Sequence, residues 1–120
     1  MSMKIHFEIP ADDLNRAKSF YNRLFGWEIY KVPGRKNYLL ITAEGEKRVS
    51  SSIIKRFSPR QTTIIYFDVP SVEEYSARIL GLGGKIVVSK KPIPGVGYFA
   101  ICHDIENNNF GIWEEDSHTK

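Results

Sequence analysis

The feature that most constrains the fold is a pattern of strand, helix and glycine stop that occurs twice. The first copy runs from Ile5 to Trp27 (IHFEIPADDLNRAKSFYNRLFGW), and the second runs from Ile64 to Gly84 (IIYFDVPSVEEYSARILGLGG). The tetrapeptides FEIP and FDVP are 60 residues apart, whereas the stopping glycines Gly26 and Gly84 are 58 apart. Because both offsets are even, either alignment places equivalent side chains on the same strand face. The chain is therefore predicted to contain one structural unit twice.

In the first half, residues 4–10 alternate in polarity and predict a strand with His6 and Glu8 on one face. A helix is expected to begin after Asp12 or Asp13 as N-cap and to end at Gly26. Its apolar residues recur at helical spacing: Leu14, Ala17, Tyr21 and Leu24, with Phe20 and Phe25 widening the stripe. Three further strands are expected over 28–32, 38–42 and 49–55, followed by a connector over 56–61.

The second half repeats this order. A strand over 62–69 precedes a helix with a capping box, in which Ser71 caps forward and Glu74 reaches back. Gly83 and Gly84 are expected to stop the helix. Strands are predicted over 85–89, 98–102 and 109–114, with a turn-rich loop over 92–97 and a frayed tail over 116–120.

Each half therefore reads as a βαβββ module. A module of about 60 residues exposes a sheet face without a helix and is marginally stable alone. We expect the two modules, about 4–56 and about 62–115, to pair as one domain spanning residues 1–120. The predicted class is α+β: a curved mixed sheet around a polar-lined cleft, with the helices on the outside.

Composition excludes several classes of protein. No apolar run approaches the ~20 residues that a membrane-spanning helix needs, and no secretory signal is visible. Cys102 is the only cysteine, which excludes an intrachain disulfide and favours a reducing, cytoplasmic location. The chain has no helix-turn-helix, zinc-finger spacing or basic recognition helix, so nucleic-acid binding is not expected.

Charge is distributed unevenly. Residues 1–60 hold twelve Lys and Arg against six Asp and Glu, whereas residues 61–120 hold five against eight. The basic half could attract the acidic half, within the fold or between subunits, or could favour an anionic ligand. Scattered solvated charge explains the same counts, because the basic residues do not follow one helical stripe.

Three segments together resemble the vicinal oxygen chelate superfamily, the glyoxalase, bleomycin-resistance and extradiol-dioxygenase group: HFEIPADDLNRAKSFYNRLFGW, YFDVPSVEEY with GLGGKIV, and PIPGVGYFAICHDIENNNFGIWE. They span nearly the whole chain. The resemblance implies paired βαβββ modules around a cleft. It further implies that enzymes of the group hold a divalent metal there, which binds vicinal substrate oxygens and stabilises an enediolate or a similar anion.

The resemblance also indicates where metal ligands would stand, on the first and fourth strands of each module. His6 occupies the first position and is a possible ligand, whereas Ile64, its counterpart in the second half, is not. Gly111 stands where the enzymes have Glu. The remaining position falls near Ser51 or Ser52, and serine is a poor ligand.

The candidate ligand-cleft residues are His6, Glu8, Tyr66, Asp68 and Trp113. Strand alternation places the first two together, places Tyr66 and Asp68 with Ile64, and places Trp113 with Gly111. Aromatic rings beside a few polar groups suit a small organic ligand. Tyr66 and Trp113 could equally be core aromatics. Cys102 and its neighbour His103 point to opposite faces, so Cys102 is interpreted as a buried structural thiol.

The favoured hypothesis is a superfamily member that binds a small organic molecule in the cleft between the modules without a full metal site. No cofactor is expected, a divalent metal is possible, and no catalytic residue is identified. The alternative is a divalent-metal-dependent lyase, isomerase or dioxygenase with His6 as one ligand. An interaction module with a filled cleft is a third possibility. The resemblance implies a homodimer.

Overall fold

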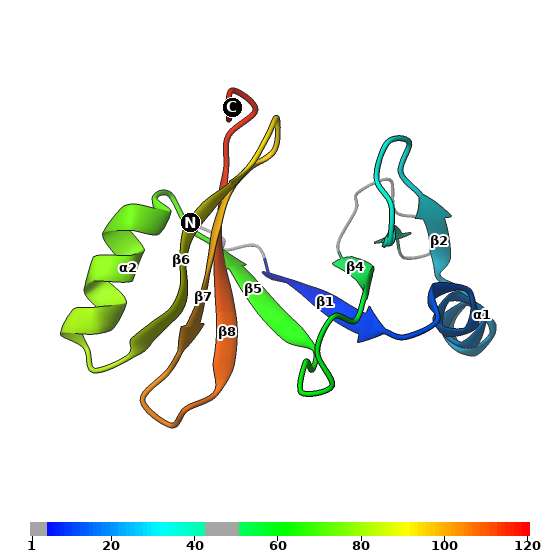
Figure 1. Cartoon of the computed structure of the whole chain (residues 1–120), viewed down its shortest axis with the longest axis horizontal. Helices are drawn as coiled ribbons and strands as arrows, with labels where there is room; N and C mark the ends of the chain where they lie inside the picture. Colours follow the sequence, from blue (N-terminus) through cyan, green and yellow to red (C-terminus); the bar gives the residue numbers. More distant parts are fainter. Residues whose placement is uncertain (1–4, 43–50) are drawn as a thin grey trace. The chain divides into compact units, whose positions relative to one another are not determined.

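The computed structural model describes residues 5–42 and 51–120, and within them the predicted repeat is confirmed. The chain divides into two compact units, His6–Thr63 and Ile64–Lys120, the second of which also includes Ile5; they are called here the first and second modules. Each module has one helix and four strands in the order strand, helix, three strands (Figure 1). The α+β class and the βαβββ modules are therefore confirmed. Neither helix of the described chain has the length and apolar character needed to cross a membrane.

The first module contains one mixed sheet. Its elements are β1 (Ile5–Ala11), α1 (Leu14–Phe25), β2 (Glu28–Lys31), β3 (Tyr38–Thr42) and β4 (Ser51–Lys55). The strands are ordered β2-β3-β4-β1 within this module. Strand β1 runs parallel to β4, and the other neighbours are antiparallel. The strand predicted over 49–55 is described from Ser51, and its first two residues lie outside the described residues.

Both predicted ends of α1 are confirmed. Asp13 is the N-cap, and its Oδ1 accepts a hydrogen bond of 3.0 Å from the Arg16 backbone N–H. At the other end Gly26 has a φ of 73°, in the left-handed region that glycine adopts without steric cost. Its N–H donates to the Asn22 carbonyl oxygen at 2.8 Å, which closes the helix.

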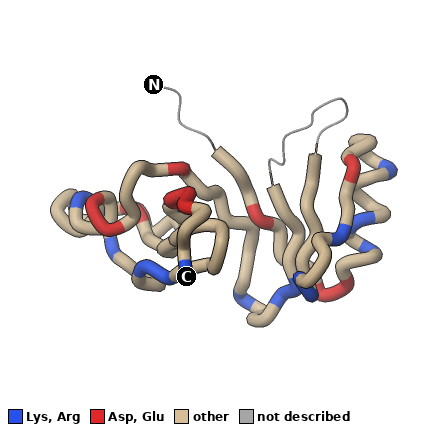
Figure 2. Tube along the Cα trace, turned by 90° about the horizontal axis from the view of Figure 1, so that it is seen from above, with Lys and Arg blue, Asp and Glu red and all other residues tan. Residues whose placement is uncertain are grey.

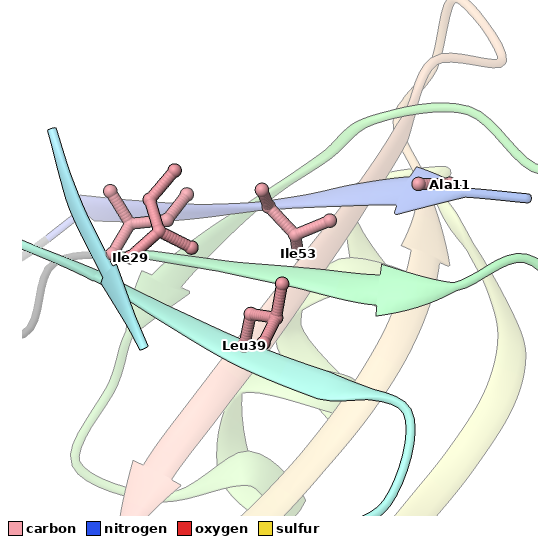
Figure 3. Close-up of a cluster of buried hydrophobic side chains, with 5 residues drawn as sticks. Ala11, Ile29, Leu39 and Ile53 are labelled. Carbon is pink, nitrogen blue, oxygen red and sulfur yellow. The ribbon is translucent and has the colours of Figure 1, made fainter. Parts of the chain in front are cut away.

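The core of the first module lies between α1 and the sheet. Figure 3 shows Ala11, Ile29, Leu39 and Ile53, one from each strand, and Ile41 completes this buried cluster. The contacts from the helix come from Leu14, Ala17 and Tyr21.

The apolar stripe predicted for α1 is too wide. Phe20, Leu24 and Phe25 are 58%, 57% and 54% exposed. Helical spacing identifies an apolar face, but the sheet contacts only the line of residues nearest to it. The helix therefore carries uncovered apolar side chains, and one of them, Phe20, borders a groove described below.

The second module has the same element order. Its elements are β5 (Ile64–Asp68), α2 (Val72–Gly81), β6 (Lys85–Ile93), β7 (Gly97–His103) and β8 (Asn109–Glu115). The strands are ordered β5-β8-β7-β6, with β5 parallel to β8 and the others antiparallel. Helix α2 lies against one face of this sheet (Figure 1). The core between them consists of Val69, Val72, Ala100, Cys102 and Ile112.

The start of α2 combines a predicted cap with one that the sequence did not reveal. The Ser71 hydroxyl accepts a hydrogen bond of 3.1 Å from the Glu74 N–H, which confirms the forward half of the capping box. In addition, Oε1 of Glu114 on β8 accepts a hydrogen bond of 2.9 Å from the Val72 N–H. A carboxylate at this end also complements the helix dipole. The last strand of the module thus helps to fix its helix.

The loop predicted over 92–97 is shorter than expected. Pro92 and Ile93 continue β6 and pair with Tyr98 and Gly97 of β7, which leaves only residues 94–96 in the turn. Within the second module β6 is the outermost strand of the order, and proline is tolerated at such a position because its missing N–H need not pair. The glycine and proline content correctly predicted a turn between β6 and β7, but the predicted turn was too long.

The prediction that residues 116–120 form a frayed tail is wrong. Thr119 is 6% exposed, and its carbonyl oxygen accepts a hydrogen bond of 2.8 Å from the Gly95 N–H. The Asp116 N–H donates to the Val96 carbonyl oxygen at 2.9 Å. The tail is thus held against the β6–β7 turn by backbone hydrogen bonds, which side-chain composition does not reveal.

Candidate functional site

The polar candidates of the first module lie on the sheet face opposite α1. Phe7 and Ile9 pack against the core, so alternation along β1 places His6 and Glu8 on the other face. Glu8 pairs in register with Ser52 of β4, whose side chain shares that face. His6 and Glu8 are both half-buried. His6 and Glu8 therefore share one face of β1, as predicted, and their part in a ligand site stays a prediction.

The β4 serines do not resemble a metal-binding position. Ser51 and Ser52 are 3% and 5% exposed. The Ser51 hydroxyl accepts a hydrogen bond of 3.1 Å from the Phe7 N–H, so its oxygen contributes to strand pairing. A neutral hydroxyl is in any case a weak ligand for a divalent cation beside imidazole or carboxylate.

The candidates of the second module also share the face opposite their helix. In the parallel pairing of β5 and β8, Tyr66 lies beside Gly111 and Asp68 lies beside Trp113. Phe110 and Ile112 pack on the α2 side, as alternation predicted. The structure thus brings Tyr66, Asp68 and Trp113 together on one face of the sheet.

Strand β7 adds two residues to this surface that sequence reasoning missed. Phe99 pairs with Trp113, and Ile101 pairs with Gly111. Their alternation with Ala100 and Cys102, which are both fully buried, places them on the face opposite α2. The alternation in the run YFAIC could have predicted this face. It required the recognition that the small residues Ala100 and Cys102 point into the core.

The Tyr66 ring covers Gly111. A Cβ atom added at Gly111 would lie 2.3 Å from both Cδ1 and Cε1 of Tyr66, far inside van der Waals contact. Tyr66 is 7% exposed, so its ring is surrounded on its other sides as well. This glycine occupies the position where the family resemblance implies a glutamate ligand, and here that volume is filled by the aromatic ring.

These residues do not fit the divalent-metal site that the resemblance implies. The second module offers Ile64 and Gly111 at the two ligand positions, and the second of these is covered by Tyr66. Over residues 5–42 and 51–120, no three His, Cys, Asp or Glu side chains are grouped so that they could hold a metal ion. His6 retains a suitable donor, but the donor set around it is not that of a family metal site.

Cys102 is a structural residue. Its side chain is fully buried in the core of the second module, and desolvation raises the pKa of its thiol to about 11. Because His103 follows it directly on β7, the two side chains point to opposite faces. The prediction of a buried thiol is confirmed, and a Cys102–His103 nucleophile pair is geometrically excluded.

Comparisons with known proteins agree with this architecture. The profile of a family described as Bleomycin resistance protein-like N-terminal matches residues 4–42. A glyoxylase-like domain-containing protein of Didymella fabae is 27% identical over 113 residues, which cover 88% of each chain. The anthracycline biosynthesis protein DnrV of Streptomyces peucetius is 20% identical and is aligned over 91% of this chain. The alignment covers 46% of that relative, so the chain spans about half its length.

Solved structures show the same fold. A glyoxalase/bleomycin resistance protein/dioxygenase superfamily member from Vibrio splendidus 12B01 aligns with a TM-score of 0.70 at 16% identity, covering 95% of this chain and 100% of that one. An extradiol ring-cleaving dioxygenase from B. fuscum aligns with a TM-score of 0.68 at 18% identity, covering 96% and 33%.

Proposed function

On the premise that this chain is a member of the vicinal oxygen chelate superfamily, we propose that it binds a small organic molecule without a complete metal site. The observation that carries this proposal is the Tyr66 ring over Gly111. A glutamate at that position would require the ring to leave. The module therefore has a buried aromatic ring where the resemblance implies that a metal-dependent enzyme has a carboxylate.

The ligand surface that we propose is the face of the second module opposite α2. Trp113 and Phe99, which are half-buried, provide aromatic area, and Asp68 provides one carboxylate beside Trp113. Tyr66 is 7% exposed and fills the space over Gly111. Aromatic rings stack favourably on planar ligands, and a few polar groups fix the orientation. His6 and Glu8 stay predicted contributors from the first module. The homodimer and the cytoplasmic location also stay predictions.

The two tryptophans of the chain, Trp27 and Trp113, allow a site-specific test. In a Trp27→Phe variant, Trp113 is the only tryptophan, and we expect its emission to be quenched saturably by 2-naphthol or a related bicyclic aromatic compound. The quenching should persist in excess EDTA, because no metal takes part. The reciprocal Trp113→Phe variant retains only Trp27 and serves as the matched control, for which little quenching is expected.

Two results would contradict the proposal. Binding that disappears in EDTA and returns with one divalent metal would favour the alternative, a metal-dependent lyase, isomerase or dioxygenase that uses His6. Equal quenching of both single-tryptophan variants would show that the probe does not select the surface around Trp113.

A further inference from the structure

A concave surface lies on the α1 side of the first module, between α1 and the end of β1. Two adjoining pockets of about 520 and 470 Å³ share Asp12 and Arg56 and together form a groove. Ala17, Phe20 and Tyr21 of α1 line the larger pocket. Its volume lies within the range of about 300–1,000 Å³ that is typical of small-molecule sites. Nothing in the proposed function uses this groove.

Most charged groups in the groove already have partners. Arg56 donates from Nε to Asp12 Oδ1 at 3.2 Å and from Nη2 to the Pro10 carbonyl oxygen at 3.2 Å. It also donates from Nη1 to the Gln61 carbonyl oxygen. Asp13 Oδ1 caps α1 by accepting a hydrogen bond from the Arg16 N–H. The carboxylates of Asp12 and Asp13 and the guanidinium group of Arg56 therefore all have hydrogen-bond partners within the protein.

The other guanidinium, that of Arg16, is the exception. Among the contacts of residues 5–42 and 51–120, its side chain has no hydrogen bond or ion pair, although it lines the groove. The module around it is basic, and Figure 2 shows Lys and Arg positions distributed along α1. An arginine in this setting presents a planar fork of donors that matches a carboxylate or sulfonate.

An aromatic surface lies one helical turn beyond this arginine. Phe20, which is 58% exposed, follows Arg16 by four residues and therefore lies on the same helix face. Its ring meets the Tyr21 ring edge-on, with centroids 5.1 Å apart. The groove thus combines an apolar aromatic wall with one available cation at its edge.

From this combination we infer that the groove is a binding site for a small aromatic anion. The aromatic body of the ligand packs on Phe20 and Ala17, and its acidic group accepts hydrogen bonds from the Arg16 guanidinium. This site is separate from the surface around Trp113, and it requires neither a metal nor the proposed function to be correct.

The test uses 1-anilinonaphthalene-8-sulfonate as the probe, because it carries an aromatic body and one fixed negative charge. Each critical residue has a matched control on the same helix. Arg16→Ala is expected to weaken binding about tenfold, whereas Arg23→Ala should leave it unchanged. Phe20→Ala is expected to weaken binding about fivefold, whereas Leu24→Ala should not. Phe20 and Leu24 are 58% and 57% exposed, so neither substitution empties the core.

The neutral analogue N-phenyl-1-naphthylamine distinguishes the contribution of the ligand's charge to binding from that of hydrophobic contact. We expect it to bind the parent protein more weakly than the sulfonate and to be insensitive to Arg16→Ala. The inference is overturned if Arg16→Ala and Arg23→Ala weaken sulfonate binding equally, since general positive charge would then explain it. It is also overturned if Phe20→Ala has no effect, or if backbone amide shifts on titration map to the β5–β8 surface instead of the groove.

Discussion

Replacing Gly111 by alanine is expected to lower the free energy of unfolding by about 3 kcal/mol, because the added methyl group overlaps the Tyr66 ring. The new Cβ would lie 2.3 Å from two ring atoms, and Tyr66 is 7% exposed and has little room to move. For a chain of this size such a loss corresponds to a decrease in melting temperature of roughly 10 °C, measurable by circular dichroism.

A double-mutant cycle isolates this contact. Tyr66→Ala alone is expected to cost about 3–5 kcal/mol through the cavity it leaves. In that background Gly111→Ala should be nearly neutral, which gives a coupling energy of about 2 kcal/mol or more.

Gly81→Ala is the matched control for the Gly111 substitution. Nothing lies within 4 Å of a Cβ at that helical glycine, so alanine there should stabilise the protein slightly. Additive effects of the Gly111 and Tyr66 substitutions would contradict the close contact between the Tyr66 ring and the Gly111 backbone.

Of the alanine substitutions at Gly81, Gly95, Gly97 and Gly111, Gly97→Ala is expected to be the most destabilising, with a loss of about 3 kcal/mol or more in the free energy of unfolding. A Cβ at Gly97 would lie 2.0 Å from the Glu114 carbonyl oxygen, and this neighbour is backbone, which cannot rotate away as a side chain can. Relief would require β7 and β8 to separate where Gly97 pairs with Glu115. Because Glu114 also caps α2, the perturbation should reach the helix.

Gly95→Ala is a control that distinguishes the cost of a steric overlap at Cβ from the cost of a left-handed backbone conformation. Gly95 has a φ of 75°, and nothing lies within 4 Å of an added Cβ, so alanine there meets only the cost of the left-handed region, about 1–2 kcal/mol. Urea unfolding of both variants gives the comparison. If Gly97→Ala proved as mild as Gly95→Ala, the tight contact between β7 and β8 would be absent in solution.

Local signals in the sequence predicted local features well. Asp13, Gly26 and Ser71 mark helix ends because capping depends on a few neighbouring residues, and all three have the expected roles. Strand faces were predictable for the same reason, since alternation is a property of the strand itself.

Features that depend on distant residues were not predictable in this way. The contact between Tyr66 and Gly111 joins two strands that are separated by a helix and two further strands. Glu114 caps α2 from the last strand of the module, and Thr119 is held by a turn that lies before two strands. The exposure of Phe20 depends on how closely a helix meets its sheet, which helical spacing does not specify.

In the candidate site, too, local features could be predicted from the sequence, whereas contacts between distant residues could not. The resemblance placed His6, Ile64 and Gly111 at ligand positions, and residue chemistry alone indicated that the set was incomplete. That Tyr66 occupies the space over Gly111 required the structure, because strand pairing decides which ring covers which backbone position.

We propose that residues 5–42 and 51–120 hold no complete metal site of the kind that the family resemblance implies. The most direct test is calorimetric titration of the metal-stripped protein with Zn²⁺, Mn²⁺, Ni²⁺ and Fe²⁺, accompanied by melting curves. We expect no saturable stoichiometric binding and no change in melting temperature that differs between the parent and a His6→Ala variant. Binding of one equivalent of any of these metals that is lost in His6→Ala would contradict it.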